Sequence, residues 1–219
     1  MSSREDILGR VRAGLHRNAT NAAAARAVMA AALASRSQGP KPAIDAEPRA
    51  LLERFRLKSE QQSSTVDIVA QESAVPAAVE RYLTAMKLPK SAVAWPSLAA
   101  LDWVGAGLEV DGRGARDADL VGITGCFCAV AETGTLMVCS SPETPAAVSL
   151  LPETHIAIVH AARILPYMED AWNLARKELG ALPRAVNFIS GPSRTGDIEQ
   201  TIVLGAHGPY RVHLVIVAG

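Results

Sequence analysis

The pattern of hydrophobic and polar positions changes near residue 65, which divides the chain into two zones. Before that point, apolar residues from Ile7 to Leu15 recur at helical spacing, and an alanine-rich stretch over 21–34 has high helix propensity. Proline and glycine in SQGPKP end this stretch. With a third short helix over 49–57, the pattern predicts an N-terminal helical segment over 1–65, which either packs on the core or reaches a second subunit.

From Val66 onward, short apolar runs alternate with helical patterns. Apolar runs of this length suit strands buried on both sides, and their separation by helices is typical of a parallel sheet. We therefore expect one α/β domain over 66–219, built on an open, mostly parallel sheet with flanking helices. The expected strands lie at 66–70, 92–95, 119–124, 155–159, 185–189 and 213–217, and the expected helices at 74–86 and 166–179.

Two further apolar runs interrupt this alternation, CFCAVA at 126–131 and TLMVCS at 135–140. Only Glu132, Thr133 and Gly134 separate them. A three-residue connection that contains glycine suits a β-hairpin, so we expect an antiparallel hairpin inserted in the domain.

Charge balance and cysteine use narrow the class of protein. The 22 Lys and Arg residues equal the 22 Asp and Glu residues, so the chain lacks the basic excess with which proteins bind nucleic acid non-specifically. The start, MSSREDILGR, has no signal-peptide pattern, and no stretch approaches the roughly 18 apolar residues of a membrane span. Three clustered cysteines do not suggest a secreted disulfide framework. We expect a cytoplasmic protein.

The first segment that can carry chemistry is the expected hairpin tip, Ala131–Thr135. It places a carboxylate and two hydroxyls in apolar surroundings. A partly buried Glu132 suits a general base, or a nucleophile that forms an acyl intermediate, with Thr133, Gly134 and Thr135 beside the ligand. The alternative is a plain turn, in which glycine supplies a positive φ and the threonine hydroxyls close local hydrogen bonds.

A second polar segment, Ser190–Glu199, precedes a helical pattern over 198–204. Its backbone N–H groups can converge on an anion, and a helix N-terminus favours negative charge. Arg194 adds a planar fork suited to carboxylate or phosphate, whereas Asp197 with Gln200 also fits a helix capping box. The segment is neither a P-loop nor a G-x-G-x-x-G fingerprint. The expected anion contacts are Ser190, Gly191, Ser193, Arg194, Thr195 and Asp197.

The third polar segment is Gly205–Pro209. Its glycines, Gly205 and Gly208, allow the backbone to approach a ligand closely, and His207 between them suits a general acid or base because its pKa lies near neutrality. The alternative is a loop histidine that caps a neighbouring element. All three segments follow or join expected strands, and ligands of open α/β sheets usually bind at the carboxyl ends of strands.

The pair Cys126 and Cys128 is a weak metal motif. Zinc or an iron–sulfur cluster needs further ligands at suitable spacing, and the third cysteine lies eleven residues beyond Cys128. On a strand the two side chains share one face, which fits apolar packing. The histidines form no ligand cluster by spacing, and His155 and His213, which open strands, fit structural roles. We predict no metal site.

Taken in order, these motifs resemble the LUD-domain family, which includes lactate utilization protein C and the YkgG-like proteins. The resemblance rests on AETGTL from Ala131, SLLP from Ser149, SGPSRTGDIE from Ser190 and LGAHGP from Leu204. It implies a fold like that of the NagB/RpiA/CoA-transferase superfamily. It also implies a role in bacterial oxidation of L-lactate to pyruvate with two iron–sulfur partner proteins, so that the clusters belong to the partners and no cofactor is expected on this chain.

One stretch departs from the family pattern. Many relatives carry a Gly/Arg-bearing stretch before SLLP, whereas residues 140–149 here read SSPETPAAVS, with no Arg and an added Glu143. If that Arg holds an anion in relatives, this protein has lost the contact or uses another substrate.

Three functions therefore remain open from the sequence. The first is a subunit of a lactate-oxidising system that binds a small anionic metabolite and works with iron–sulfur proteins. The second is a separate enzyme of the CoA-transferase or sugar-phosphate isomerase kind, with Glu132 and His207 as candidate catalytic residues. The third is a regulatory or structural partner that docks, or forms homo-oligomers, through its N-terminal helices.

Overall fold

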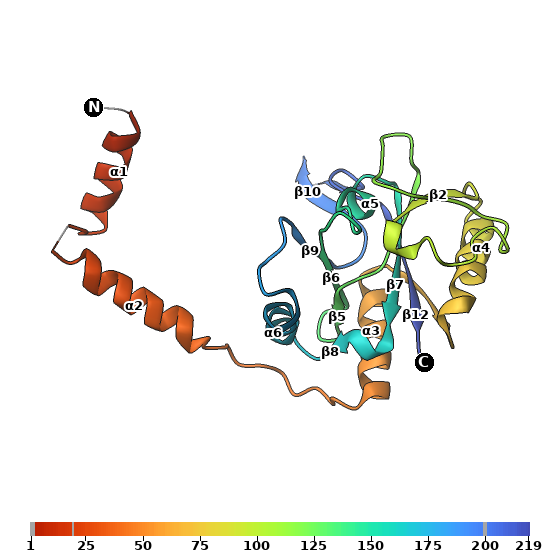
Figure 1. The fold of residues 1–219 in the computed structure, drawn as a ribbon, viewed down its shortest axis with the longest axis horizontal. Coiled ribbons are helices and arrows are strands. Elements are labelled where there is room, and N and C mark those ends of the chain that lie inside the picture. The colour runs from red at the N-terminus through yellow and green to blue at the C-terminus, as the bar shows by residue number, and fades with distance from the viewer. Residues whose placement is uncertain (1–2, 19, 199–200) are drawn as a thin grey trace. The chain divides into compact units, whose positions relative to one another are not determined.

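A six-stranded parallel sheet forms the centre of the structure, a computed structural model that describes residues 3–18, 20–198 and 201–219 (Figure 1). Every neighbouring pair in this sheet is parallel. The sequence-based expectation of a mostly parallel sheet is confirmed. Its strands, in spatial order, are β1 (Thr65–Val69), β12 (Arg211–Val217), β7 (Thr154–His160), β4 (Val121–Thr124), β2 (Ser91–Ala94) and β3 (Glu109–Gly112).

A second sheet contains the expected hairpin. Strands β5 and β6 pair antiparallel with Val130 opposite Thr135, so the hairpin is confirmed. β9 pairs antiparallel with β6, and the two-residue strand β8 pairs parallel with β5. The strands in spatial order are β8 (Ile164–Leu165), β5 (Cys128–Val130), β6 (Thr135–Cys139) and β9 (Val186–Ile189).

Helices cover only part of the sheet surfaces. One face of the central sheet is covered by α4 (Val75–Ala85), which packs Val79 and Leu83 against Ile156, Ile158 and Val215. The other face is covered by the second sheet together with α3 (Pro48–Gln61) and the short α5 (Ala147–Leu150). The outer face of the second sheet is covered by α6 (Met168–Leu179). The 3-10 turns are Glu72–Ala74, Pro96–Leu98 and Ala161–Arg163.

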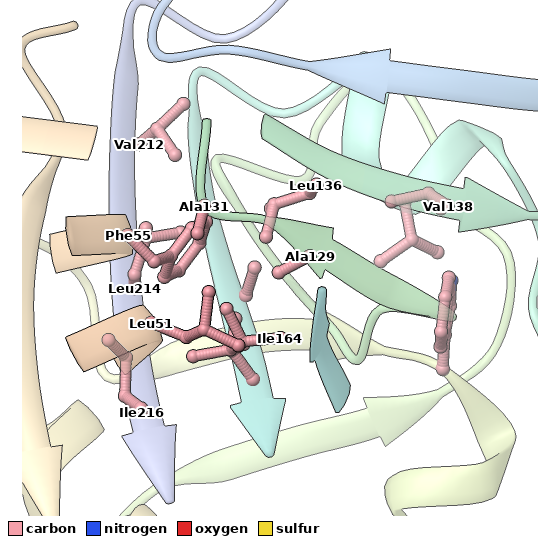
Figure 2. Close-up of a cluster of buried hydrophobic side chains, with 14 of the residues drawn as sticks. Leu51, Phe55, Ala129, Ala131, Leu136, Val138, Ile164, Val212, Leu214 and Ile216 are labelled. Atoms are coloured by element: carbon pink, nitrogen blue, oxygen red, sulfur yellow. The ribbon is translucent and has the colours of Figure 1, made fainter. Parts of the chain in front are cut away.

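The core between the two sheets gathers side chains from distant parts of the sequence (Figure 2). Phe55 of α3 is fully buried beside Ala131 of the hairpin and Leu214 of β12. Apolar surface of this kind contributes about 25 cal/mol for each Å² removed from water. The hairpin is therefore fixed against both α3 and the central sheet.

The chain forms two compact units, Met1–Pro42 and Ala43–Gly219. The first contains α1 (Ser3–Gly14) and α2 (Ala22–Ser35), both at predicted positions, and none of their described residues is buried. The third predicted helix, α3, belongs to the second unit. It begins at Pro48 and is capped by Glu47, whose side chain accepts hydrogen bonds from Arg49 N and Ala50 N. The helix buries Leu51 and Phe55.

The helix predicted over 198–204 is wrong. Residues Arg194–Ile198 and Thr201–Leu204 form the antiparallel strands β10 and β11, with Arg194 opposite Leu204. The β-branched residues Thr201, Ile202 and Val203 favour a strand, and an apolar run this short does not distinguish the two structures. Gln200 of the expected capping box lies outside the described residues.

No helix among the described residues is long and apolar enough to cross a membrane.

Candidate functional site

Two of the polar segments meet at one end of the second sheet. The register places Leu136 opposite Ile189, so Thr135 at the start of β6 lies next to Ser190 after β9. The Thr135 Oγ1 and Ser190 Oγ atoms are 2.6 Å apart, and Thr133 Oγ1 lies 2.7 Å from Thr135 Oγ1. These contacts form a chain of three hydroxyls, in which the middle one is buried and the outer two belong to exposed residues.

The C-terminal end of α3 closes against this hydroxyl chain, which the sequence alone did not indicate. Gly134 has φ +68°, and a Cβ there would lie 2.6 Å from the backbone of Lys58 and Ser59. Gly191 has φ +75°, and its Cβ would lie 2.1 Å from the Gln62 carbonyl oxygen. Both positions require glycine for conformation and for close approach. In the sequence, these glycines indicated that another backbone segment lies close by, but they did not indicate that this segment is α3.

Arg194 also lies at the C-terminal end of α3. Its guanidinium donates to the Ser63 hydroxyl, just after α3, and the side chain is exposed. Among the side chains that the structure describes, which do not include that of Asp197, no carboxylate pairs with it. An exposed guanidinium with one neutral partner retains donors for a carboxylate or phosphate ligand.

The third polar segment packs on Ser193. Ser193 N donates to Pro209 O at 2.8 Å, Gly205 N donates to Ser193 O at 3.0 Å, and His207 N donates to Ser193 Oγ at 3.3 Å. A Cβ on Gly208 would lie 3.5 Å from the Ser193 Cβ. The structure thus brings all three predicted segments together, and we call residues 131–135, 190–195 and 205–209 the polar cluster.

The position of the polar cluster differs from the expected one. Ser63 immediately precedes β1, and the segment 205–209 immediately precedes β12, so the cluster lies at the amino ends of parallel strands. We expected the carboxyl ends, where ligands of open α/β sheets usually bind. Among the described residues that follow Ser190, no helix begins, so the predicted helix dipole is not available to an anion here.

The two candidate catalytic residues have little support from geometry. Glu132 is half-buried, its backbone N donates to Pro166 O at 3.1 Å, and no described residue bonds its carboxylate. His207 is exposed and contacts Ser193 only through its backbone N–H. Thr195 and Asp197 lie on β10, and the side chain of Asp197 is outside what the structure describes.

Two other histidines are buried away from the polar cluster. His155 Nε2 lies 2.8 Å from Thr124 Oγ1, and His213 Nδ1 lies 2.9 Å from Thr65 Oγ1 while its ring stacks on Tyr82 at 3.9 Å. Burial lowers the pKa of each imidazole to about 4. Both rings are therefore neutral at pH 7, in keeping with the structural roles expected for them.

The cysteines do not share a strand face as expected, because β5 begins only at Cys128. Cys126 packs toward the core between the sheets, whereas Cys128 packs under α6. Burial raises the pKa of both thiols to about 12, so neither is a thiolate at neutral pH. The described residues contain no group of three or more His, Cys, Asp or Glu side chains that could hold a metal ion.

The fold is that of an α/β domain with a parallel central sheet, and a second sheet contains the antiparallel hairpin. The polar cluster lies at one end of this second sheet. The family model of the LUD domain matches residues 54–217. This chain belongs to the LUD-domain family.

Curated relatives agree with this assignment. Lactate utilization protein C of Bacillus subtilis is 36% identical over 129 residues, which cover 57% of this chain and 53% of the relative. Lactate utilization protein C 1 of Bacillus mycoides is 43% identical over 112 residues, 50% of this chain and 47% of the relative. The chain therefore spans about half the length of these relatives. The Exiguobacterium protein of the same name is 35% identical over 180 residues, 76% of this chain and 77% of the relative.

One solved structure is similar in fold. It is a DUF162 family protein from Deinococcus radiodurans, with a TM-score of 0.57 and 21% identity. The similarity covers 79% of this chain and 99% of that chain.

Proposed function

We propose that this chain is the C-type subunit of a system that oxidises L-lactate to pyruvate in the cytoplasm, and that its polar cluster binds a small anionic metabolite. The names of the relatives support the pathway, since the three described above are lactate utilization proteins C. The anionic ligand is supported by the polar cluster itself.

The observation that carries the anion site is Arg194. Its exposed guanidinium donates to the Ser63 hydroxyl. Ser63 follows Gln62, whose carbonyl oxygen approaches Gly191, the residue after Ser190 of the hydroxyl chain. No carboxylate whose side chain the structure describes pairs with this guanidinium. A planar fork and neighbouring hydroxyls are the donors that bind carboxylates and phosphates. The glycine contacts with α3 hold these donors in a fixed arrangement before any ligand arrives.

The oxidation itself is assigned to partner proteins. The names of the relatives, lactate utilization protein C, support one component of a system that has others. We propose iron–sulfur proteins as those partners and no cofactor on this chain.

A capture experiment tests the partnership. Tagged full-length protein is recovered from its native host grown on L-lactate, and the co-purifying proteins are identified and assayed for iron and acid-labile sulfide. Iron–sulfur proteins in the lactate-grown sample and their absence from a glucose-grown control support the proposal. Recovery of this protein alone, with turnover of a CoA thioester or a sugar phosphate that Glu132→Gln abolishes, overturns it in favour of a separate enzyme.

A thermal-shift experiment tests the anion site. L-lactate, pyruvate and inorganic phosphate are titrated against the wild type, Arg194→Ala and Arg176→Ala. Arg176 is an exposed arginine on α6 that donates to Asn173 Oδ1. We expect ligand-dependent stabilisation in the wild type and Arg176→Ala, and its loss in Arg194→Ala. Equal shifts in all three proteins rule out Arg194 as the anion contact.

A further inference from the structure

A pocket of about 420 Å³ lies at the end of the second sheet away from the polar cluster. Thr135 begins β6 at the polar cluster, and Cys139 ends β6 at this pocket. The two sites are therefore separated by the length of a five-residue strand, about 3.3 Å for each residue. The residues that line the pocket come mainly from the loops after β2, β4, β6 and α6, and they include Trp95, Cys126, Phe127, Cys139, Leu179 and Pro183.

The pocket occupies the place in the central sheet where ligands of this architecture usually bind. Trp95 directly follows β2, and Cys126 follows β4, so the carboxyl ends of these neighbouring strands open into it. The chain runs from β2 to β3, which forms an edge of the central sheet. After β4 the next strand of the central sheet is β7, which lies on the other side of β4 from β2. Such a reversal of strand order leaves a crevice at the carboxyl ends of the strands.

The inner wall of the pocket is apolar and rigid. The Trp95 ring is held by its Nε1, which donates to Pro145 O at 3.1 Å, and Gly125 allows the chain to pass its ring edge, with a Cβ position 3.5 Å away. The Phe127 ring is held by Arg163, whose guanidinium lies 4.9 Å from the ring centroid and pairs with Glu178. These contacts leave preorganised aromatic surface for a flat apolar group.

The outer wall is polar. Ser140 and Ser141 line both this pocket and an adjoining hollow of about 610 Å³, which Arg184 also lines. Arg184 is the residue after Pro183 of the pocket wall, and it is exposed. Within residues 3–18, 20–198 and 201–219, no carboxylate pairs with its guanidinium. Thr144 Oγ1 donates to Cys139 O, so the Ser141 hydroxyl donates to Thr144 Oγ1. The Ser140 hydroxyl only accepts, from Ala185 N, and its proton and the Arg184 guanidinium are the donors available to an anionic group.

We propose that this pocket binds a small carboxylic acid that carries an aromatic group. The ring lies against Trp95 and Phe127, and the carboxylate lies toward Ser140 and Arg184. The opposite orientation is unfavourable because Leu179 ends α6, and the last carbonyl groups of a helix carry partial negative charge that repels an anion.

The size of the pocket separates this ligand from the one proposed for the polar cluster. A volume of about 420 Å³ falls in the usual range of about 300–1,000 Å³ for small-molecule sites, and a three-carbon acid would leave most of it unfilled. Because the two sites lie at opposite ends of β6, binding in this pocket is independent of lactate or phosphate binding at Arg194.

Isothermal titration of the full chain tests this inference. Phenylacetate is compared with its neutral isostere phenylacetamide and with L-lactate. The variants are Arg184→Ala, Arg184→Lys and Ala181→Trp, the last of which places a ring in the pocket from an exposed position in its wall. Arg176→Ala and Arg194→Ala are the matched controls, because both remove an exposed guanidinium elsewhere.

We expect phenylacetate to bind at least about tenfold more tightly than phenylacetamide, because a hydrogen-bonded charge contributes more than a neutral group. Arg184→Ala should remove this difference, Arg184→Lys should restore part of it, and both controls should retain it. Ala181→Trp, verified as folded by circular dichroism, should abolish binding. Equal affinity for acid and amide, unchanged affinity in Arg184→Ala, or the absence of phenylacetate binding to the wild type overturns the inference.

Discussion

Thr135 Oγ1 and Ser190 Oγ lie 2.6 Å apart although the residues are separated by 55 positions in the sequence. Thr135 is almost fully buried at the start of β6, and Ser190 is exposed just after β9. The contact joins the hairpin tip to the loop that carries Arg194. The alternative considered from the sequence, that the threonine hydroxyls close only local hydrogen bonds, is therefore incomplete, because Thr135 also bonds across two strands.

The first prediction concerns this contact. Thr135→Val keeps the shape of the side chain but removes the hydroxyl shared by Thr133 and Ser190. We expect the free energy of unfolding to fall by about 1–2 kcal/mol, because a buried hydrogen bond is lost and its partners are only partly resolvated. Urea denaturation measures this change. Thr133→Val, at an exposed position, should lose less, and an equal loss in both variants would contradict the central role of Thr135.

The second prediction separates backbone strain from close approach. Gly107 and Gly134 both have a positive φ, +76° and +68°, but a Cβ on Gly107 meets no atom within 4 Å, whereas a Cβ on Gly134 would lie 2.6 Å from α3. Gly107→Ala should cost about 1–2 kcal/mol, the penalty of the positive φ alone. Gly134→Ala should cost clearly more, because α3 must move. Similar midpoints of denaturation for the two variants would show that the backbone of α3 is not in close contact with Gly134.

Periodicity predicted the elements whose burial is regular. Strands β7 and β12 are largely apolar runs because they are buried between two layers. Their predicted positions, and that of the edge strand β1, agree with the structure within one or two residues. The strand β3 (Glu109–Gly112) was not predicted, because an edge strand of sequence EVDG has no apolar run. The helix predicted over 198–204 was wrong, because a short run gives no reliable period.

The polar cluster was predicted in part. Its three segments carry glycines, hydroxyls and an arginine at loop positions, and the structure brings these segments together. The participation of Gln62 and Ser63 could not be foreseen, because their sequence reads only as the end of a helix. The amino-end location depended on strand order, which the sequence does not reveal. The pocket beside Trp95 was not predicted for the same reason.

The third prediction concerns pH. His155 and His213 have pKa values of about 4 in the folded protein, below the ordinary value of 6.5 that holds after unfolding. Between these values the unfolded chain binds more protons, so stability is complete above pH 6.5 and is lost as the pH falls toward 4. The loss amounts to about 3 kcal/mol for each histidine.

Urea denaturation at pH 7.5 and 5.0 tests this dependence. His213→Phe keeps a ring that can stack on Tyr82 but cannot be protonated, so its stability should fall less between the two pH values than that of the wild type. His160→Gln, at an exposed position, should behave like the wild type. The same pH dependence in all three proteins would show that His213 is not the titrating group.

The fourth prediction concerns the boundary of the folded domain. The sequence places it near residue 65, whereas the second compact unit begins at Ala43 and includes Phe55, which is fully buried in the core between the sheets. A chain of residues 43–219 should therefore melt at the same temperature as the full chain, followed by circular dichroism, and a chain of residues 66–219 should not fold. Phe55→Ala should cost about 3–5 kcal/mol, whereas Leu57→Ala, at a position that is 44% exposed, should cost less than about 1 kcal/mol. Cooperative melting of residues 66–219 near the wild-type temperature would place the N-terminal boundary of the folded domain at residue 65. It would also show that the domain folds without α3.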